Sequence, residues 1–173
     1  MTTLILFLIS CQVFGAFVGA LTAVWGEIAY IHAMRLPDRQ AGDGKIDAAE
    51  RAHLHIIANG LRFGMSLILL ASLALVIVAF TLHGTVQPAM TASYWIFILF
   101  VFLIIGLSWA LSRHHISFAL CSVAALTAWW LLAYITLGQL TVSFGGAIAL
   151  YVVLTAIFYA VLCLIRFLAL SKK

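Results

Sequence analysis

The sequence predicts an all-α integral membrane protein: a five-transmembrane-helix bundle with its N-terminus outside the cell and its C-terminus in the cytoplasm. Three observations predict this fold class. Hydrophobic residues make up 66% of the chain, charged residues only 8%, and the apolar residues form five long runs. Each run can cross a ~30 Å hydrocarbon core, which takes about 20 helical residues. Because a backbone in lipid must satisfy its own hydrogen bonds, unbroken runs of this length are helices rather than barrel strands.

The predicted helices follow one another along a single transmembrane domain that covers residues 1–173. We expect them at residues 4–31, 56–82, 94–111, 116–137 and 144–168. The polar segment 35–55 is predicted to form a cytoplasmic hairpin between the first two helices. The third and fourth connections are short, and short links make neighbouring helices run antiparallel.

The polar hairpin also predicts where the first helix ends and the second begins. Leu36-Pro37 should end the first helix, because the residue before a proline avoids the α region. Asp47 and Glu50 have the spacing of an N-cap and an N3 residue, which is a capping box. The second helix should therefore start about two turns before it enters the membrane.

Basic residues at alternate junctions give the bundle its direction. Eight of the nine Lys and Arg residues lie at or near the ends of the first, third and fifth apolar runs, and the ninth, Arg62, lies within the second run. By the positive-inside rule, these junctions face the cytoplasm. Because the cations are split among short junctions, the net charge of +4 indicates the lipid bilayer as partner and not nucleic acid. The predicted location is the bacterial plasma (inner) membrane, which the chain crosses several times.

Small residues predict which helices touch. Gly15 and Gly19 lie four residues apart on the first helix, and Gly60 and Gly64 have the same spacing on the second. Small residues at this spacing let two helix backbones approach closely in lipid. We expect the first helix to pack on the second through these glycines, with a homodimer face as the alternative.

Two charged residues inside the predicted spans mark a candidate site. Glu27 and Arg62 are symmetric about the turn at Gly44–Lys45, so in an antiparallel hairpin they should lie at equal height. An ionised side chain at membrane depth costs ~3 kcal/mol or more near the centre, and it usually pairs or faces a cavity. The sequence therefore predicts a buried Glu27–Arg62 pair, with a structural or a functional role.

The candidate site extends along the same helix faces. The second helix carries His55, Asn59, Arg62 and Ser66 at successive spacings of four, three and four residues, so these side chains share one face. Together with the first helix they predict a buried polar site that opens toward the cytoplasm. Its members are Glu27, Tyr30, His55, Asn59, Arg62 and Ser66.

Histidines near the cytoplasmic helix ends are the candidates for a haem or metal site. His32, His55 and His115 could approach one another at this face, and Tyr159 could line a groove on the last helix. A b-type haem needs axial imidazoles that face a cavity, and here no histidine lies deep in a span. We therefore favour the interpretation that these histidines lie at the membrane interface over the interpretation that they bind haem or a metal. No catalytic motif and no metal-ligand spacing occurs.

A family resemblance rests on the first two helices. It is carried by Trp25-Gly26-Glu27, Arg62-Phe63-Gly64 and Leu70-Ala71-Ser72-Leu73-Ala74-Leu75. This stretch resembles small uncharacterised bacterial membrane proteins and, more distantly, the CopD-like and protoporphyrinogen-oxidase-like group of haem- or copper-linked membrane proteins. That group has a histidine within its first span. This chain has none before His32, so the resemblance does not carry haem binding over.

These observations favour a small polytopic inner-membrane protein without catalytic activity, acting as an accessory or assembly subunit. Its expected partners are other membrane subunits or further copies of itself. One alternative is a membrane redox protein that holds haem, quinone or a metal at its cytoplasmic side, with haem as the suggested cofactor. The second alternative is an oligomeric transporter or channel.

Overall fold

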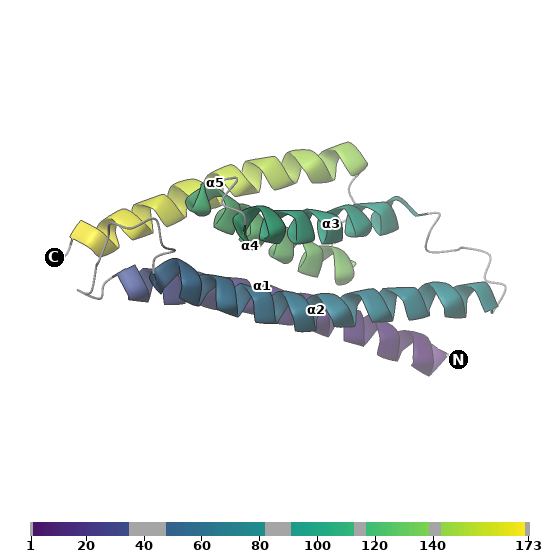
Figure 1. Ribbon diagram of the computed structural model, residues 1–173. Coiled ribbons are helices and arrows are strands. Elements are labelled where there is room, and N and C mark those ends of the chain that lie inside the picture. The colour runs from purple at the N-terminus through teal and green to yellow at the C-terminus, as the bar shows by residue number, and fades with distance from the viewer. Residues whose placement is uncertain (1, 35–47, 82–90, 113–116, 139–142, 172–173) are drawn as a thin grey trace.

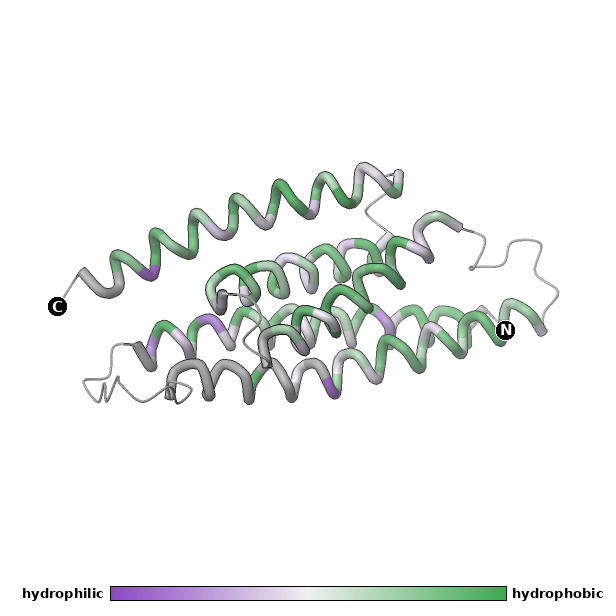
Figure 2. The backbone as a smooth tube through the Cα atoms, turned by 45° about the horizontal axis from the view of Figure 1, so that its top comes forward, coloured by the Kyte–Doolittle hydropathy of each residue, from purple (hydrophilic) through white to green (hydrophobic). Residues whose placement is uncertain are grey.

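The computed structural model describes residues 2–34, 48–81, 91–112, 117–138 and 143–171, and all regular secondary structure in these ranges is helical. The helices are α1 (Thr2–Met34), α2 (Ala48–Thr81), α3 (Ala92–Ser112), α4 (Phe118–Thr136) and α5 (Phe144–Ser171). All five are long and apolar enough to cross a membrane, which confirms the predicted all-α bundle of five transmembrane helices. Hydrophobic colours dominate every helix in Figure 2, with few hydrophilic positions between them.

The helix boundaries lie close to those expected. α2 begins at Ala48, directly after the predicted N-cap, although Asp47 itself lies outside the described residues. α1 and α5 continue about one turn past the apolar runs that predict them, to Met34 and Ser171. The predicted stop at Leu36-Pro37 also lies outside the described residues.

Successive helices alternate in direction along the bundle (Figure 1). α1, α3 and α5 run one way, while α2 and α4 run back, so the two chain termini lie at opposite ends. α1 and α2 lie side by side as a pair, α4 packs against α1, α3 and α5, and α5 forms the outermost layer. Residues near the last turns of α1 and α5 are therefore at the same end as the first turns of α4.

Helix α4 is the centre of the bundle. Every side chain from Cys121 to Trp129 is buried. α4 nevertheless has the lowest hydropathy of the five candidate spans, and α5, whose side chains are mostly exposed, has the highest. In lipid no hydrophobic force draws the most apolar helix inward, so close packing of small side chains decides which helix is central.

The glycines lie where α1 meets α2. A Cβ on Gly15 would stand 3.0 Å from the carbonyl oxygen of Gly64, and one on Gly60 would stand 2.0 Å from Oγ1 of Thr22. These separations are shorter than ordinary van der Waals contact. The two backbones can approach this closely because neither helix carries a side chain at these positions.

The indole of Trp129 on α4 fits into a notch that Gly19 of α1 and Gly64 of α2 leave at this contact. A Cβ on Gly19 would stand 2.0 Å from the ring of Trp129, and one on Gly64 would stand 3.3 Å from it. Trp129 is itself only 2% exposed. The Trp129 ring fills the space that the two glycines leave, and this contact sets the position of the α1–α2 pair along α4.

Candidate functional site

The candidate site is a buried ion pair between the first and the last helix. Nη2 of Arg166 on α5 lies 2.6 Å from Oε2 of Glu27 on α1. The two residues are only 8% and 4% exposed. A buried charge in low dielectric is stable only when it is paired and hydrogen-bonded, and each of these side chains supplies the opposite charge for the other.

The topology of the bundle brings the pair together. Glu27 lies seven residues before the end of α1, and Arg166 lies five residues before the end of α5. At 1.5 Å per residue, both are about 8–10 Å from the same end of two parallel helices. Ser122 lies four residues after the start of the antiparallel α4, which places it at this height as well.

Arg166 makes two further contacts at this level. Its Nη2 donates a hydrogen bond of 3.1 Å to Oγ of Ser122. Its guanidinium carbon lies 5.0 Å from the centre of the Tyr30 ring, within the range of a cation–π interaction. We refer to Glu27, Tyr30, Ser122 and Arg166 as the clamp, because these four residues join α1, α4 and α5.

The clamp keeps some hydrogen-bonding capacity. Oε1 of Glu27 and Nε of Arg166 are buried and have no hydrogen-bond partner among the described residues. Buried polar atoms of this kind are commonly satisfied by ordered water. Each of these two atoms can therefore form one further hydrogen bond, for example to a water molecule. The paired charges suit the clamp to hold the helices together.

The structure corrects the predicted partner of Glu27. The carboxylate pairs with Arg166, while the side chains of Arg62 and Ser66 are exposed. The reason is rotational. Arg62 lies two residues from both Gly60 and Gly64, and at about 100° per residue it points away from the face on which these glycines meet α1. Equal height along a hairpin does not set the direction of a side chain.

The structure separates the other predicted site residues. Tyr30 joins Glu27 in the clamp, whereas His32 and Tyr159 are exposed. The side chains of His55 and Asn59, and the whole of His115, lie outside the described residues. Within the described ranges, no group of three or more His, Cys, Asp or Glu residues could hold a metal ion.

Sequence reasoning missed Arg166 and Ser122. Arg166 resembles a boundary cation because it lies near the end of the last apolar run, and Ser122 resembles an ordinary packing residue. One signal was available: the first and fifth helices of an alternating bundle are parallel, and Glu27 and Arg166 are at similar distances from their C-terminal ends. Matching charges by height across all parallel and antiparallel helices would have included this pair.

Other contacts near the clamp hold α3, α4 and α5 together. The Cys121 thiol of α4 donates to the carbonyl oxygen of Leu107 on α3 at 3.1 Å. The Tyr151 hydroxyl of α5 donates to the carbonyl oxygen of Ala124 at 3.3 Å. Both of these hydrogen bonds join neighbouring helices.

Comparison with protein-family models, with curated proteins and with solved structures gives no match.

Proposed function

We propose that this multi-pass membrane protein is a non-catalytic accessory or assembly subunit of a bacterial plasma membrane, and that α5 is the helix that meets its partner. The observation that carries the proposal is how little of α5 the bundle covers. Of its described side chains only Ala147 and Arg166 are buried. On α4, in contrast, nine consecutive residues, Cys121 to Trp129, are buried.

The composition of the uncovered surface supports a protein partner over lipid alone. Ala149, Ala156 and Ala160 are exposed on α5 among larger apolar residues such as Val153 and Ile157. Exposed small side chains allow another helix to approach closely, and interfaces between transmembrane helices are enriched in them. Lipid chains adapt to any apolar surface, so contact with lipid alone does not require small residues between the larger ones.

The clamp supports the same role by controlling how α5 is presented. α5 is the outermost helix, and polar contacts from Tyr151 and Arg166 attach it to its neighbours. Directional bonds set the rotation of a helix about its axis, which apolar packing alone specifies weakly. We infer that the clamp determines which face of α5 a partner meets.

The proposed orientation places the clamp toward the cytoplasm. Basic residues follow the C-terminal ends of α1 and α5 in the sequence, beginning at Arg35 and ending with Lys172 and Lys173. The positive-inside rule supports cytoplasmic placement of such segments. A fluorescent protein fused after Lys173 should fold and fluoresce if this orientation is right.

Site-specific crosslinking in living cells tests the partner role. A photoreactive amino acid is placed at Val153 or Ile157 on α5 and, as matched controls, at Leu70 on α2 or Phe102 on α3, all of which are more than half exposed. We expect one discrete protein adduct from the α5 positions and none from the controls. The adducted protein, identified by mass spectrometry, should fail to assemble in cells that lack this chain.

Three results would contradict the proposal. Crosslinks to lipid alone from both α5 positions would mean that α5 has no protein partner. An adduct with twice the mass of the chain would indicate a homo-oligomer. An adduct whose partner assembles normally without this protein would mean that the contact has no assembly role.

A further inference from the structure

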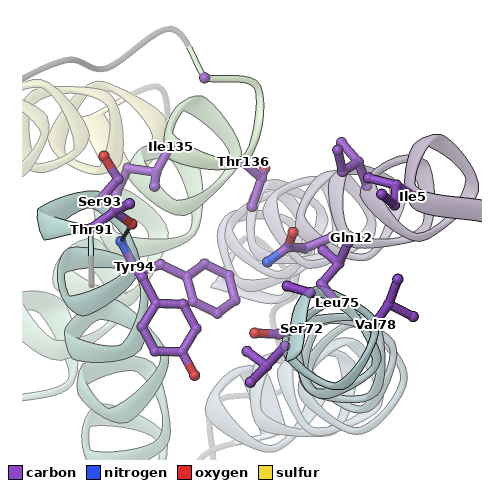
Figure 3. Close-up of a pocket in the computed structure, with 15 residues that line it drawn as sticks. Ile5, Gln12, Ser72, Leu75, Val78, Thr91, Ser93, Tyr94, Ile135 and Thr136 are labelled. Atoms are coloured by element: carbon purple, nitrogen blue, oxygen red, sulfur yellow. Dashed lines mark hydrogen bonds between the residues drawn. The ribbon is translucent and has the colours of Figure 1, made fainter. Parts of the chain in front are cut away.

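A cleft lies at the opposite end of the bundle from the clamp. It has a volume of about 380 Å³ and is lined by the first part of α1, the last part of α2, the start of α3 and the end of α4. Figure 3 shows it between the α1–α2 pair and the α3–α4 pair, with Gln12 and Ser72 on one side and Tyr94 on the other. We call it the four-helix cleft. Its volume is within the range of small-molecule sites.

The walls are apolar with a few polar groups and no charge. Ile9, Leu75 and Phe97 contribute hydrocarbon, and Gln12 and Tyr94 contribute hydrogen-bonding groups. Among the lining residues that the structure describes, none is Asp, Glu, Lys, Arg or His. A charged ligand would find no counterion here, and desolvating it would be unfavourable. The cleft therefore suits an uncharged molecule.

Gln12 is the residue that points to a ligand. It lies ten residues after the start of α1, about 15 Å along the helix at 1.5 Å per residue, within the apolar stretch Thr3–His32 that is long enough to cross a membrane. No hydrogen bond joins its amide to another described residue. An amide without a partner inside an apolar span is unfavourable, and polar groups inside a membrane commonly mark binding sites.

We propose that the four-helix cleft binds the ring of a lipid-soluble quinone. Gln12 and Tyr94 line the cleft from α1 and α3, on opposite sides (Figure 3). Both are hydrogen-bond donors, and a quinone ring carries two uncharged carbonyl acceptors on opposite edges. The apolar chain of the molecule would pass between α2 and α3, which pack against each other only slightly.

The position of Gln12 within the span favours a quinone over an ordinary membrane lipid, while Tyr94 lies two residues after the start of α3, nearer the end of the bundle. A glycerolipid keeps its polar head at the membrane surface, so its hydrocarbon chain would lie beside Gln12 and leave the amide unpaired. A quinone ring needs no charged head group and can enter the hydrocarbon region. The proposal concerns binding and includes no electron-transfer step. It does not depend on α5 or on the accessory role.

Photolabelling of the purified full-length protein in lipid nanodiscs tests this proposal. The probe is an azido-benzoquinone with a ten-carbon chain, and labelled peptides are mapped by mass spectrometry. We expect labels on α1 near Gln12 and on α3 near Tyr94, with labelling abolished by the same quinone without the azide. Gln12→Leu and Tyr94→Phe should each weaken the apparent affinity about tenfold, as expected for one lost hydrogen bond.

Ser10→Ala is the matched control. Ser10 lies two residues from Gln12, is exposed, and donates its hydroxyl to the carbonyl oxygen of Leu6 in its own helix. Its removal should leave labelling unchanged. Tyr94→Phe keeps the ring and removes only the hydroxyl, so it decides the outcome if Gln12→Leu does not fold.

Two results would overturn the proposal. In the first, labels spread over the lipid-facing side chains of all helices and do not respond to the competitor or to Tyr94→Phe. In the second, a monoacylglycerol that carries a diazirine on a chain of the same length labels the same peptides as strongly, which would show that the cleft recognises the chain and not the ring.

Discussion

The two ends of this bundle treat polar side chains in opposite ways. At one end, the clamp buries a carboxylate and a guanidinium that contact each other at 2.6 Å, and the guanidinium also contacts Ser122 and Tyr30. At the other end, the four-helix cleft leaves about 380 Å³ open beside the uncharged Gln12 and Tyr94. One end is closed around charge, and the other is open around neutral groups.

The contrast follows from how strongly each kind of group resists leaving water. An isolated ion in low dielectric is far more costly than an unpaired amide, so the protein must supply the partner of an ion from its own side chains. An amide can remain unpaired in the folded protein and be satisfied later by a ligand. Buried charge therefore predicts a structural role here, and an unpaired neutral group predicts a binding role.

The largest expected effect comes from breaking the clamp on one side. Glu27→Gln leaves Arg166 buried without a counterion and should lower the free energy of unfolding by about 3–5 kcal/mol, as should Arg166→Gln. The double variant should lose less than the sum of the two, because neither charge is then left alone. Unfolding in lipid bicelles, followed by steric trapping, measures all three values.

Arg62→Gln is the control for that cycle. The Arg62 side chain is exposed, so this substitution should change the stability by less than about 0.5 kcal/mol. Additive losses from Glu27→Gln and Arg166→Gln, or a large loss from Arg62→Gln, would show that Glu27 is not paired as the structure has it.

The second-largest effect is expected where Trp129 of α4 packs against Gly19 of α1, between the clamp and the four-helix cleft. Gly19→Ala adds a Cβ that would stand 2.0 Å from the Trp129 ring, so the indole or α1 must shift, at a cost of about 3 kcal/mol. Gly106→Ala on α3, where nothing lies within 4 Å, should be neutral or gain up to about 1 kcal/mol in helix propensity. Equal losses from the two variants would mean that the notch for Trp129 does not register the helices.

A smaller effect comes from the neutral member of the clamp. Ser122→Ala removes the hydrogen bond from Arg166 but leaves the ion pair, and should cost about 1.5–2 kcal/mol. The loss should disappear in the background of Arg166→Gln, where that hydrogen bond cannot form. If Ser122→Ala costs the same in both backgrounds, its effect is one of packing and not of the bond.

The smallest effect is expected at the cleft, and its sign is opposite. Gln12→Leu replaces an amide that has no partner among the described residues with a hydrocarbon side chain, so without ligand it should stabilise the protein by about 1 kcal/mol. Ser10→Ala in the same helix provides the baseline in the same unfolding assay. A loss of more than about 1 kcal/mol from Gln12→Leu would show that the protein itself satisfies the amide, and the contrast between the ends would fail.

Several features of the fold could be predicted from the sequence. The five spans, their approximate ends and the start of α2 at Ala48 follow from hydropathy and from a local capping pattern. These properties depend on single helices, because each helix in lipid must be long enough to cross the membrane and must satisfy its own backbone. Glycine spacing on α1 and α2 likewise indicated a close contact, since only small residues permit one.

The candidate site could be predicted only in part. Glu27 was identifiable from its charge within a span. It lies on the same helix face as Gly15 and Gly19, at a spacing that is a multiple of four residues, and this face points into the bundle. Its partner was not, because height along a helix says nothing about rotation. The glycines of α2 already face α1, and this same packing turns Arg62 away.

The sequence by itself thus determined what must be buried in the membrane and how long each helix must be. Tertiary structure decided which helices are lateral neighbours and how each is rotated, and so which side chains meet. Glu27 and Arg166 are separated by 139 positions and meet because α1 packs on α4 through Trp129 and the small residues around it, while α5 packs on α4 as well. In lipid all apolar helices are equally well solvated, so only the detailed fit of side chains can make that choice.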